Sequence, residues 1–360
     1  MNLPVIALLG RKDEPTDAVE EYCRYLGTAL HSHDIQFEIR RVPWETHGWS
    51  DSLTTLRLQA ADWRDRWVLV QYTALAWSSR GFPQKFLRAL NILKSAGTRI
   101  GIVFHDVEPF SGTRLIDSVR RLVQVRTMRR ALTLADLAVF TVPPGKLSWL
   151  PAVPPQAAFV PVGPNLPMPP APLAHPQDVV PTIGVFSITG GESGTRETQI
   201  ILGAVRHAAQ KLGKLRLSVF GRHAELRESD LRDGLRDLPV ELSVEGVVEP
   251  AQVVQKLSAC DVLLFVRGGI SSRRSSAIAG IACGLPLIAF SSSATAPPVT
   301  DAGVVLVPPD QLDQLNAALV RLLSDHVYRA DLAARSRAAY QTHFVWSAIA
   351  VRFSALLKTR

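Results

Sequence analysis

Short apolar runs alternate along the chain with segments whose apolar residues recur at helical spacing. The clearest run, Val262–Val266, has no polar interruption, as expected for a strand buried on both faces of a parallel sheet. Similar runs predict strands at Val5–Leu9, Phe37–Arg40, Trp67–Gln71, Ile100–Phe104, Leu137–Val142, Phe159–Val162, Thr182–Phe186, Leu215–Phe220, Val240–Val244, Leu287–Phe290 and Val304–Val307. Helices are predicted at Asp17–Ser32, Pro83–Ala96, Thr113–Thr133 and Ser276–Cys283. This repeated alternation predicts an α/β protein with two Rossmann-like, doubly wound parallel sheets.

Proline marks the boundary between the two predicted sheets. Of the 25 prolines, 13 fall between Pro143 and Pro181, and such a segment forms a semi-rigid connector. We therefore expect an N-terminal domain over residues 1–165, a linker over 163–181 and a C-terminal domain over 180–342. The last predicted helix, over 346–360, is long enough to pack against the N-terminal domain. Two doubly wound domains that face each other would share one cleft at the carboxyl ends of their strands.

The amino-acid composition restricts the classes of binding partner but does not identify one of them. The net charge is +8 and 47% of the residues are hydrophobic, which excludes a disordered chain and favours nucleic acid, an anionic membrane surface or phosphorylated ligands. Aromatic residues are not interleaved with the basic loops, which argues against nucleic acid. The three cysteines lack metal-type spacing, and no apolar stretch is long enough to span a membrane. We expect a cytoplasmic protein.

A basic loop follows the strand Val262–Val266. Residues 267–275 contain two glycines, hydroxyl side chains and three arginines, and they lead into a helix. Backbone N–H groups and guanidiniums at a helix N-terminus form a cradle for anions, because both match phosphate oxygens. A nucleoside diphosphate is the ligand that fits best. An ordinary basic surface loop is the alternative.

An ordered set of motifs extends over nearly the whole C-terminal half. They are Ile183-Gly184-Val185-Phe186, Arg196, Leu217-Ser218-Val219-Phe220-Gly221, Val244-Glu245-Gly246-Val247, Leu257-Ser258-Ala259-Cys260-Asp261-Val262, Ala282-Cys283-Gly284-Leu285-Pro286-Leu287-Ile288-Ala289, Asp301-Ala302-Gly303 and Val307-Pro308-Pro309-Asp310. In this order they resemble the nucleotide-sugar domain of the group 1 (family 4-like) glycosyltransferases. The resemblance implies the GT-B fold, with an acceptor domain at the N-terminus, and retaining transfer of a hexose from a nucleotide sugar.

Two carboxylates typical of that family are missing. Counted back from Gly284-Leu285-Pro286, their positions hold Ser271 and Ala279. In the family the second carboxylate usually holds the donor ribose, and the first is associated with the donor sugar. The family's arginine after the first strand of this domain is also absent, since Gly190-Gly191 occupies that place, whereas Arg196 matches a family lysine. A GT-B binding or assembly protein without catalysis is therefore the alternative function, and an enzyme such as a nucleotide-sugar epimerase is a third.

The resemblance also implies candidate site residues. His105 and Asp106 close a central strand, where the family often carries a histidine, and they are the catalytic candidates; a polar anchor for the loop is the alternative for His105. The donor-binding candidates are Gly10, Gly190, Gly191, Arg196, Arg222, Gly269, Ser271, Ser272, Arg273, Arg274 and Ser275. We expect no metal and no cofactor besides the nucleotide-sugar substrate, because guanidiniums can stabilise the leaving diphosphate.

The segment 113–133 combines six arginines with a single acid, Asp117. Its apolar residues recur at helical spacing, so it fits a peripheral contact with the inner face of a membrane, close to a lipid-linked acceptor. A solvated basic face is the alternative. Sugar and protein acceptors remain open beside the lipid-linked one. Asp17 precedes a predicted helix and is expected to cap it.

Overall fold

The computed structural model describes residues 3–14, 16–112, 114–169 and 180–359. Contacts divide the chain into two units, Met1–Pro161 with Trp346–Arg360, and Val162–Val345. The division falls close to the predicted boundary at residue 165. The middle of the predicted linker, residues 170–179, lies outside the described residues, as does Thr113 of the predicted basic segment.

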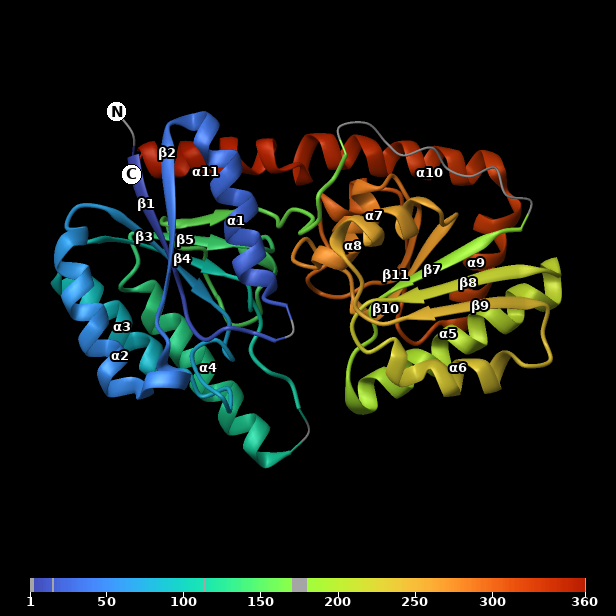
Figure 1. Cartoon of the computed structure of the whole chain (residues 1–360), viewed down its shortest axis with the longest axis horizontal. Helices are drawn as coiled ribbons and strands as arrows, with labels where there is room; N and C mark the ends of the chain where they lie inside the picture. The colour runs from blue at the N-terminus through green and yellow to red at the C-terminus, as the bar shows by residue number, and fades with distance from the viewer. Residues whose placement is uncertain (1–2, 15, 113, 170–179, 360) are drawn as a thin grey trace. The chain divides into compact units, whose positions relative to one another are not determined.

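The N-terminal unit is built on a six-stranded parallel sheet in the order β2-β1-β3-β4-β5-β6. Its strands are β1 (Leu3–Leu9), β2 (Ile35–Arg41), β3 (Trp67–Tyr72), β4 (Arg99–Phe104), β5 (Leu137–Phe140) and β6 (Ala157–Phe159). Its helices are α1 (Ala18–Leu30), α2 (Trp44–Ala60), α3 (Gln84–Ser95), α4 (Leu115–Leu132) and α11 (Trp346–Thr359). Helices α1 and α11 cover one face of the sheet, and α2, α3 and α4 cover the other (Figure 1).

Helix α11 belongs to this unit although it closes the chain. The indole Nε1 of Trp67 donates a hydrogen bond to the carbonyl of Leu357 at 3.0 Å. At the other end of the helix, Trp346 stacks on Tyr25 with ring centroids 5.7 Å apart. The buried hydrogen bond joins α11 to β3, and the aromatic stacking joins it to α1.

The C-terminal unit repeats the plan, with a parallel sheet in the order β12-β11-β10-β7-β8-β9. Its strands are β7 (Thr182–Phe186), β8 (Leu215–Phe220), β9 (Val240–Glu245), β10 (Val262–Gly269), β11 (Leu287–Phe290) and β12 (Val304–Val307). Its helices are α5 (Gly191–Leu212), α6 (Glu228–Leu235), α7 (Pro250–Ser258), α8 (Ser275–Ala282), α9 (Leu312–Ser324) and α10 (His326–Ala339). Helices α5, α6 and α9 lie on one face, and α7, α8 and α10 on the other (Figure 1).

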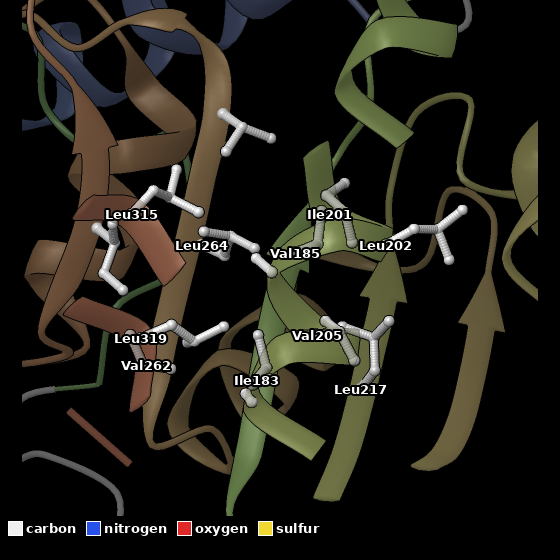
Figure 2. Packing of buried hydrophobic residues seen from close by; sticks show 14 of the residues in the cluster. Ile183, Val185, Ile201, Leu202, Val205, Leu217, Val262, Leu264, Leu315 and Leu319 are labelled. Carbon is white, nitrogen blue, oxygen red and sulfur yellow. The ribbon is translucent and has the colours of Figure 1, made fainter. Parts of the chain in front are cut away.

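The core of the C-terminal unit lies between the sheet and the first of these helix layers. Figure 2 shows Ile201 and Val205 of α5 directed toward Val185 and Ile183 of β7, with Leu264 of β10 beside them. All belong to one cluster of buried apolar side chains. The predicted α/β class with two parallel sheets is thus confirmed.

Several predicted strand ends differ from those observed, two of them by three residues, and helix α2 was not predicted. Strand β6 ends at Phe159 rather than Val162, because Pro161 has no N–H to extend the ladder. Strand β10 continues past Val266 to Gly269 through an irregular register, so Arg267 lies in the strand. Helix α2 has few buried residues and is interrupted at Gly48, which has φ 74°, so its helical period is weak in the sequence.

Each sheet has one point where the chain reverses its direction of winding. In the N-terminal unit it lies at β1, which pairs with β2 on one side and β3 on the other. In the C-terminal unit it lies at β7, between β8 and β10. Ligands of doubly wound sheets bind beyond the carboxyl ends of the strands at such points, because the adjacent loops diverge there. The loops after β1, β3, β7 and β10 are therefore the expected ligand-binding positions.

Candidate functional site

The loop after β7 presents the N-terminus of α5. Gly190 is the N-cap, and Gly191 adopts φ 64°, a left-handed conformation that glycine adopts without strain. Arg227 donates to the Gly191 carbonyl at 2.7 Å. The first N–H groups of this long helix have no partner within the helix, and with the helix dipole they favour an anion.

A buried carboxylate holds this loop in place. Glu197, which is 7% exposed, accepts a hydrogen bond from the Thr189 backbone N–H at 2.8 Å. A Cβ placed on Gly194 would lie 1.8 Å from the Thr189 carbonyl oxygen, so the loop packs directly on the helix backbone. The ring of His223 covers Gly190, with Nε2 3.4 Å from the position of a Cβ there. Sequence reasoning identified the two glycines but missed Glu197 and His223.

Arginines gather at the carboxyl end of β10. Arg267, Arg273 and Arg274 are all half-buried. The Nη2 atom of Arg274 lies 3.6 Å from where a Cβ on Gly268 would be, so its guanidinium lies against the end of strand β10. The Nε atom of Arg267 is buried and has no hydrogen-bond partner among the described residues. Since a buried donor without a partner costs about 1–3 kcal/mol, Arg267 is suited to a ligand that supplies an acceptor.

The charges around Arg267 connect this strand to its neighbours. Burial lowers the pKa of the Arg267 guanidinium, the carboxylate of Glu197 opposes this lowering, and the positive charge of Arg222 adds to it. Arg222 follows β8 and Glu197 lies on α5, so loops from three adjacent strands bring their charges together. Arginine stays protonated despite such shifts. The arrangement is therefore a fixed excess of positive charge at the switch point of the sheet.

The remaining predicted donor residues differ in exposure. Ser271 and Ser272 are only 2% and 1% exposed, and Ser272 accepts the Val162 N–H through its carbonyl. Gly269 packs against Ser292, whose Cβ is 2.3 Å from a Cβ built on the glycine. Ser275 begins α8. Arg196 is exposed on the second turn of α5.

The N-terminal unit has a cavity of about 210 Å³ at its own switch point. Its lining comes from the carboxyl ends of β1, β3 and β4 and the loops after them: Leu9, Gly10, Arg11, Asp13, Asp17, Ala18, Val19, Gln71, Thr73, Leu75, Ala76 and Asp106. Asp106 accepts a hydrogen bond from the Ala74 N–H at 2.8 Å. The cavity combines carboxylates, an amide and a hydroxyl, which are groups that hydrogen-bond to hydroxylated ligands.

His105 lies behind the wall of this cavity rather than in its lining. Its Nε2 is 2.8 Å from Oε1 of Gln71, and its ring meets Tyr22 edge-on at 4.8 Å. Desolvation lowers the pKa of His105 to about 4, although the charge of Asp17 opposes the shift. The ring is therefore neutral near pH 7, and its Nε2–H donates to Gln71. Gln71 is 1% exposed and lines the cavity, so His105 orients a cavity residue.

Two other residues of this edge support the loops. A Cβ on Gly10 would lie 2.1 Å from the Ala76 carbonyl oxygen, so the glycine allows the loops after β1 and β3 to meet. Asp17 caps α1 by accepting from the N–H groups of Val19 and Glu20, as predicted, and it pairs with Arg41 at 3.0 Å.

Among the described residues, no three His, Cys, Asp or Glu side chains lie together in a way that could hold a metal ion.

Comparison with known proteins identifies the fold. The chain is similar to sucrose-phosphate synthase from Thermosynechococcus elongatus, with TM-score 0.71, 18% identity and coverage of 99% of this chain and 98% of that one. It is also similar to Anabaena HepE solved with UDP and glucose, with TM-score 0.66, 15% identity and coverage of 99% and 100%. These likenesses define a protein of the GT-B fold.

The family follows from the sequence of the C-terminal unit. Residues 188–325 match the family described as glycosyl transferases group 1. The chain is 28% identical over 138 residues to a GDP-mannose-dependent monoacylated alpha-(1-6)-phosphatidylinositol monomannoside mannosyltransferase of Corynebacterium glutamicum, which is 37% of this chain. The match spans about a third of that relative, 36% of its length. Most of the C-terminal unit thus matches the group 1 glycosyl transferases, and the resemblance seen in the motifs is confirmed.

Proposed function

We propose that the protein transfers a hexose from a nucleoside-diphosphate sugar to an acceptor, with retention of configuration at the anomeric carbon. The group 1 match over residues 188–325 supports this, as does the use of GDP-mannose in the name of the C. glutamicum relative. The observation that carries the proposal is Arg267, a half-buried guanidinium with an unsatisfied Nε at the carboxyl end of β10. A pyrophosphate supplies the acceptor oxygens that this donor lacks.

The chemistry follows from where the positive charge lies. When the bond from the anomeric carbon to the phosphate oxygen breaks, negative charge grows on the leaving diphosphate. Arg267, Arg273 and Arg274, with the N–H groups at the start of α5, stabilise that charge more in the transition state than in the bound donor. Arg222 and Arg196 add to the positive potential at the same edge. In this proposal the arginines and amides neutralise the diphosphate, and no metal or further cofactor is needed.

We place the acceptor in the cavity of the N-terminal unit. Asp106 and Gln71 present an acidic and an amide side chain to it, and both suit a hydroxyl nucleophile. His105 acts through Gln71 as a positioning residue. The chemistry of the cavity fits a sugar hydroxyl, carried by a free sugar, a lipid-linked glycan or a protein.

A second candidate is a protein of the same fold that binds a nucleotide sugar without transferring it. Ser271 and Ala279 occupy the positions of the family's two carboxylates, and both are buried, at 2% and 1% exposure. Neither side chain can hold the ribose as a carboxylate does. The two candidates share the diphosphate site and differ only in turnover.

Binding of UDP, GDP and ADP, measured by calorimetry, tests the shared site. We expect one nucleotide to bind, and the double variant Arg273→Ala/Arg274→Ala to bind about tenfold to a hundredfold more weakly, because charge-assisted hydrogen bonds are lost. Arg232→Ala is the matched control, since Arg232 is an exposed cation of α6 paired with Glu228. If none of the three nucleotides binds, both candidate functions are wrong.

Turnover then separates the candidates. The corresponding nucleotide hexose is incubated with sugar, lipid-linked and peptide acceptors, and the product anomer is identified by NMR. A glycosylated product with the donor's configuration supports transfer. Binding without any consumption of the donor supports the second candidate. Conversion of the donor into another nucleotide sugar, without an acceptor, would instead indicate an epimerase.

A further inference from the structure

Helix α4 carries an apolar stripe that faces solvent. Leu115 is 90% exposed, and Ile116, Val119 and Leu122 are each about half exposed, at 49%, 50% and 49%. Leu115, Val119 and Leu122 are spaced by four and three residues, so they form one row on the helix. The first turns of α4 project beyond the other helices of the N-terminal unit (Figure 1). A row of exposed branched side chains is unusual on a surface that faces only water.

The opposite face of α4 explains why the stripe is not part of the core. Thr127, Met128 and Ala131 are buried in the unit. Gln124 is also buried, and its side chain donates to the Gly81 carbonyl at 2.8 Å. The helix is thus already anchored through its inner face, and its outer face is available to a partner.

The charges beside the apolar stripe indicate which kind of partner fits this face of α4. Arg114, Arg121, Arg126 and Arg130 are exposed around it, whereas the only acid in α4, all of which is described, is Asp117. That carboxylate is buried and bonds to Arg120 at 2.6 Å. The outer face therefore has cations and apolar groups but no negative charge. A second copy of the chain is disfavoured, because a two-fold contact would bring the same arginines together.

We propose that α4 docks the N-terminal unit on a bilayer that contains anionic lipids. Leu115, Val119 and Leu122 enter the boundary between headgroups and acyl chains, and the arginines pair with the lipid phosphates and carboxylates. None of the described helices is long and apolar enough to cross a membrane, so the contact is peripheral. Because α4 begins after the carboxyl end of β4, docking by its first turns places the polar cavity of this unit near the lipid surface.

Vesicle flotation with the full chain tests this without nucleotide, so the result does not depend on the proposed reaction. One set of vesicles contains phosphatidylcholine alone, and the other an equimolar mixture with phosphatidylglycerol. We expect binding to the mixed vesicles at about 0.1 M NaCl and much weaker binding at about 0.5 M, since salt screens the arginines. Equal binding to both kinds of vesicle would contradict the proposal.

Two variants separate the apolar and ionic contributions. Leu115→Ser/Val119→Ser/Leu122→Ser should weaken binding to mixed vesicles at least about tenfold, because buried apolar area is lost. Arg121→Gln/Arg126→Gln should weaken it about twenty-five-fold, since each basic residue near an anionic surface contributes about fivefold. The matched controls are Leu226→Ser/Val327→Ser, exposed apolar residues of the other unit, and Arg57→Gln/Lys211→Gln, exposed cations outside α4.

Substitutions at exposed positions should leave the thermal midpoint within a few degrees of wild type, which is verified first. No flotation of the wild type, or equal flotation of the α4 variants and the controls, would overturn the proposal. Sedimentation provides a second outcome. If the chain is a dimer that the triple serine variant converts to monomer and it does not bind vesicles, the stripe is an interface between copies and the lipid assignment is wrong.

Discussion

Replacing Arg267 by methionine should affect stability and nucleotide binding in opposite directions. Methionine keeps most of the length of the apolar stem but removes the guanidinium, whose buried Nε has no hydrogen-bond partner among the described residues. Burial and the charge of Arg222 disfavour the cation, and Glu197 favours it. A buried unsatisfied donor costs about 1–3 kcal/mol, and losing the attraction to Glu197 offsets part of that gain. We expect a net stabilisation of about 1 kcal/mol.

The same substitution should weaken the bound nucleotide. A hydrogen bond to a charged group contributes about 1.5–3 kcal/mol. Loss of one such contact to the diphosphate therefore raises the dissociation constant about tenfold to a hundredfold. If Arg267 served only the fold, the variant would instead lose stability and keep its affinity.

Two measurements on the same samples check this. Scanning calorimetry of the unliganded protein should show the unfolding transition of the C-terminal unit about 2–4 °C higher in Arg267→Met. Titration calorimetry with the nucleotide that binds wild type gives the affinity. Arg206→Met, an exposed position on α5, is the matched control and should change neither value appreciably. A transition that falls by several degrees with unchanged affinity would refute the assignment of Arg267 to the diphosphate.

Three further outcomes are expected. Gly194→Ala displaces the Thr189 carbonyl and should weaken nucleotide binding in calorimetry, whereas Gly203→Ala, which meets nothing within 4 Å in the same helix, should stabilise the protein by about 0.5–1 kcal/mol. The pKa of His105 is about 4 in the folded state and about 6.5 in the unfolded state, so the unfolded state binds the extra proton as the pH falls. The free energy of unfolding should therefore decrease by about 2–3 kcal/mol from pH 7 to pH 4. Urea denaturation over this pH range should show a smaller decrease for His105→Gln. Gly10→Ala should abolish transfer in the product assay by displacing the cavity loop, while Gly145→Ala, with open space around it, keeps it.

Local patterns along the chain determine much of the fold. Strands β7, β8, β11 and β12 begin and end where their apolar runs predict, because apolar positions bounded by polar or turn residues mark a strand packed against a core. The cap of α1 at Asp17 is equally local, since one carboxylate satisfies the first N–H groups of the helix. Helix α2 was missed because its stability comes from packing on α3 rather than from a regular apolar period.

The candidate site shows most clearly which features can be predicted from the sequence and which depend on the tertiary structure. The glycines at 190 and 191 and the arginines at 273 and 274 could be proposed from the sequence because they lie in one loop or at one helix start, where short motifs are visible. Arg267 was counted among the three arginines of the predicted basic loop but was not among the predicted donor-binding residues. Its role depends on Glu197 and Arg222, which come from other strands and become its neighbours only when the sheet forms.

For this protein, the sequence alone determined the alternation of elements, the two-sheet class and the family, since each depends on periodicity or on ordered motifs along the chain. The tertiary structure decided which charges meet, that His105 supports Gln71 from behind instead of lining the cavity, and that α4 turns apolar side chains toward solvent. These depend on distances between residues far apart in the chain, and burial and electrostatic interaction are set by those distances rather than by local order.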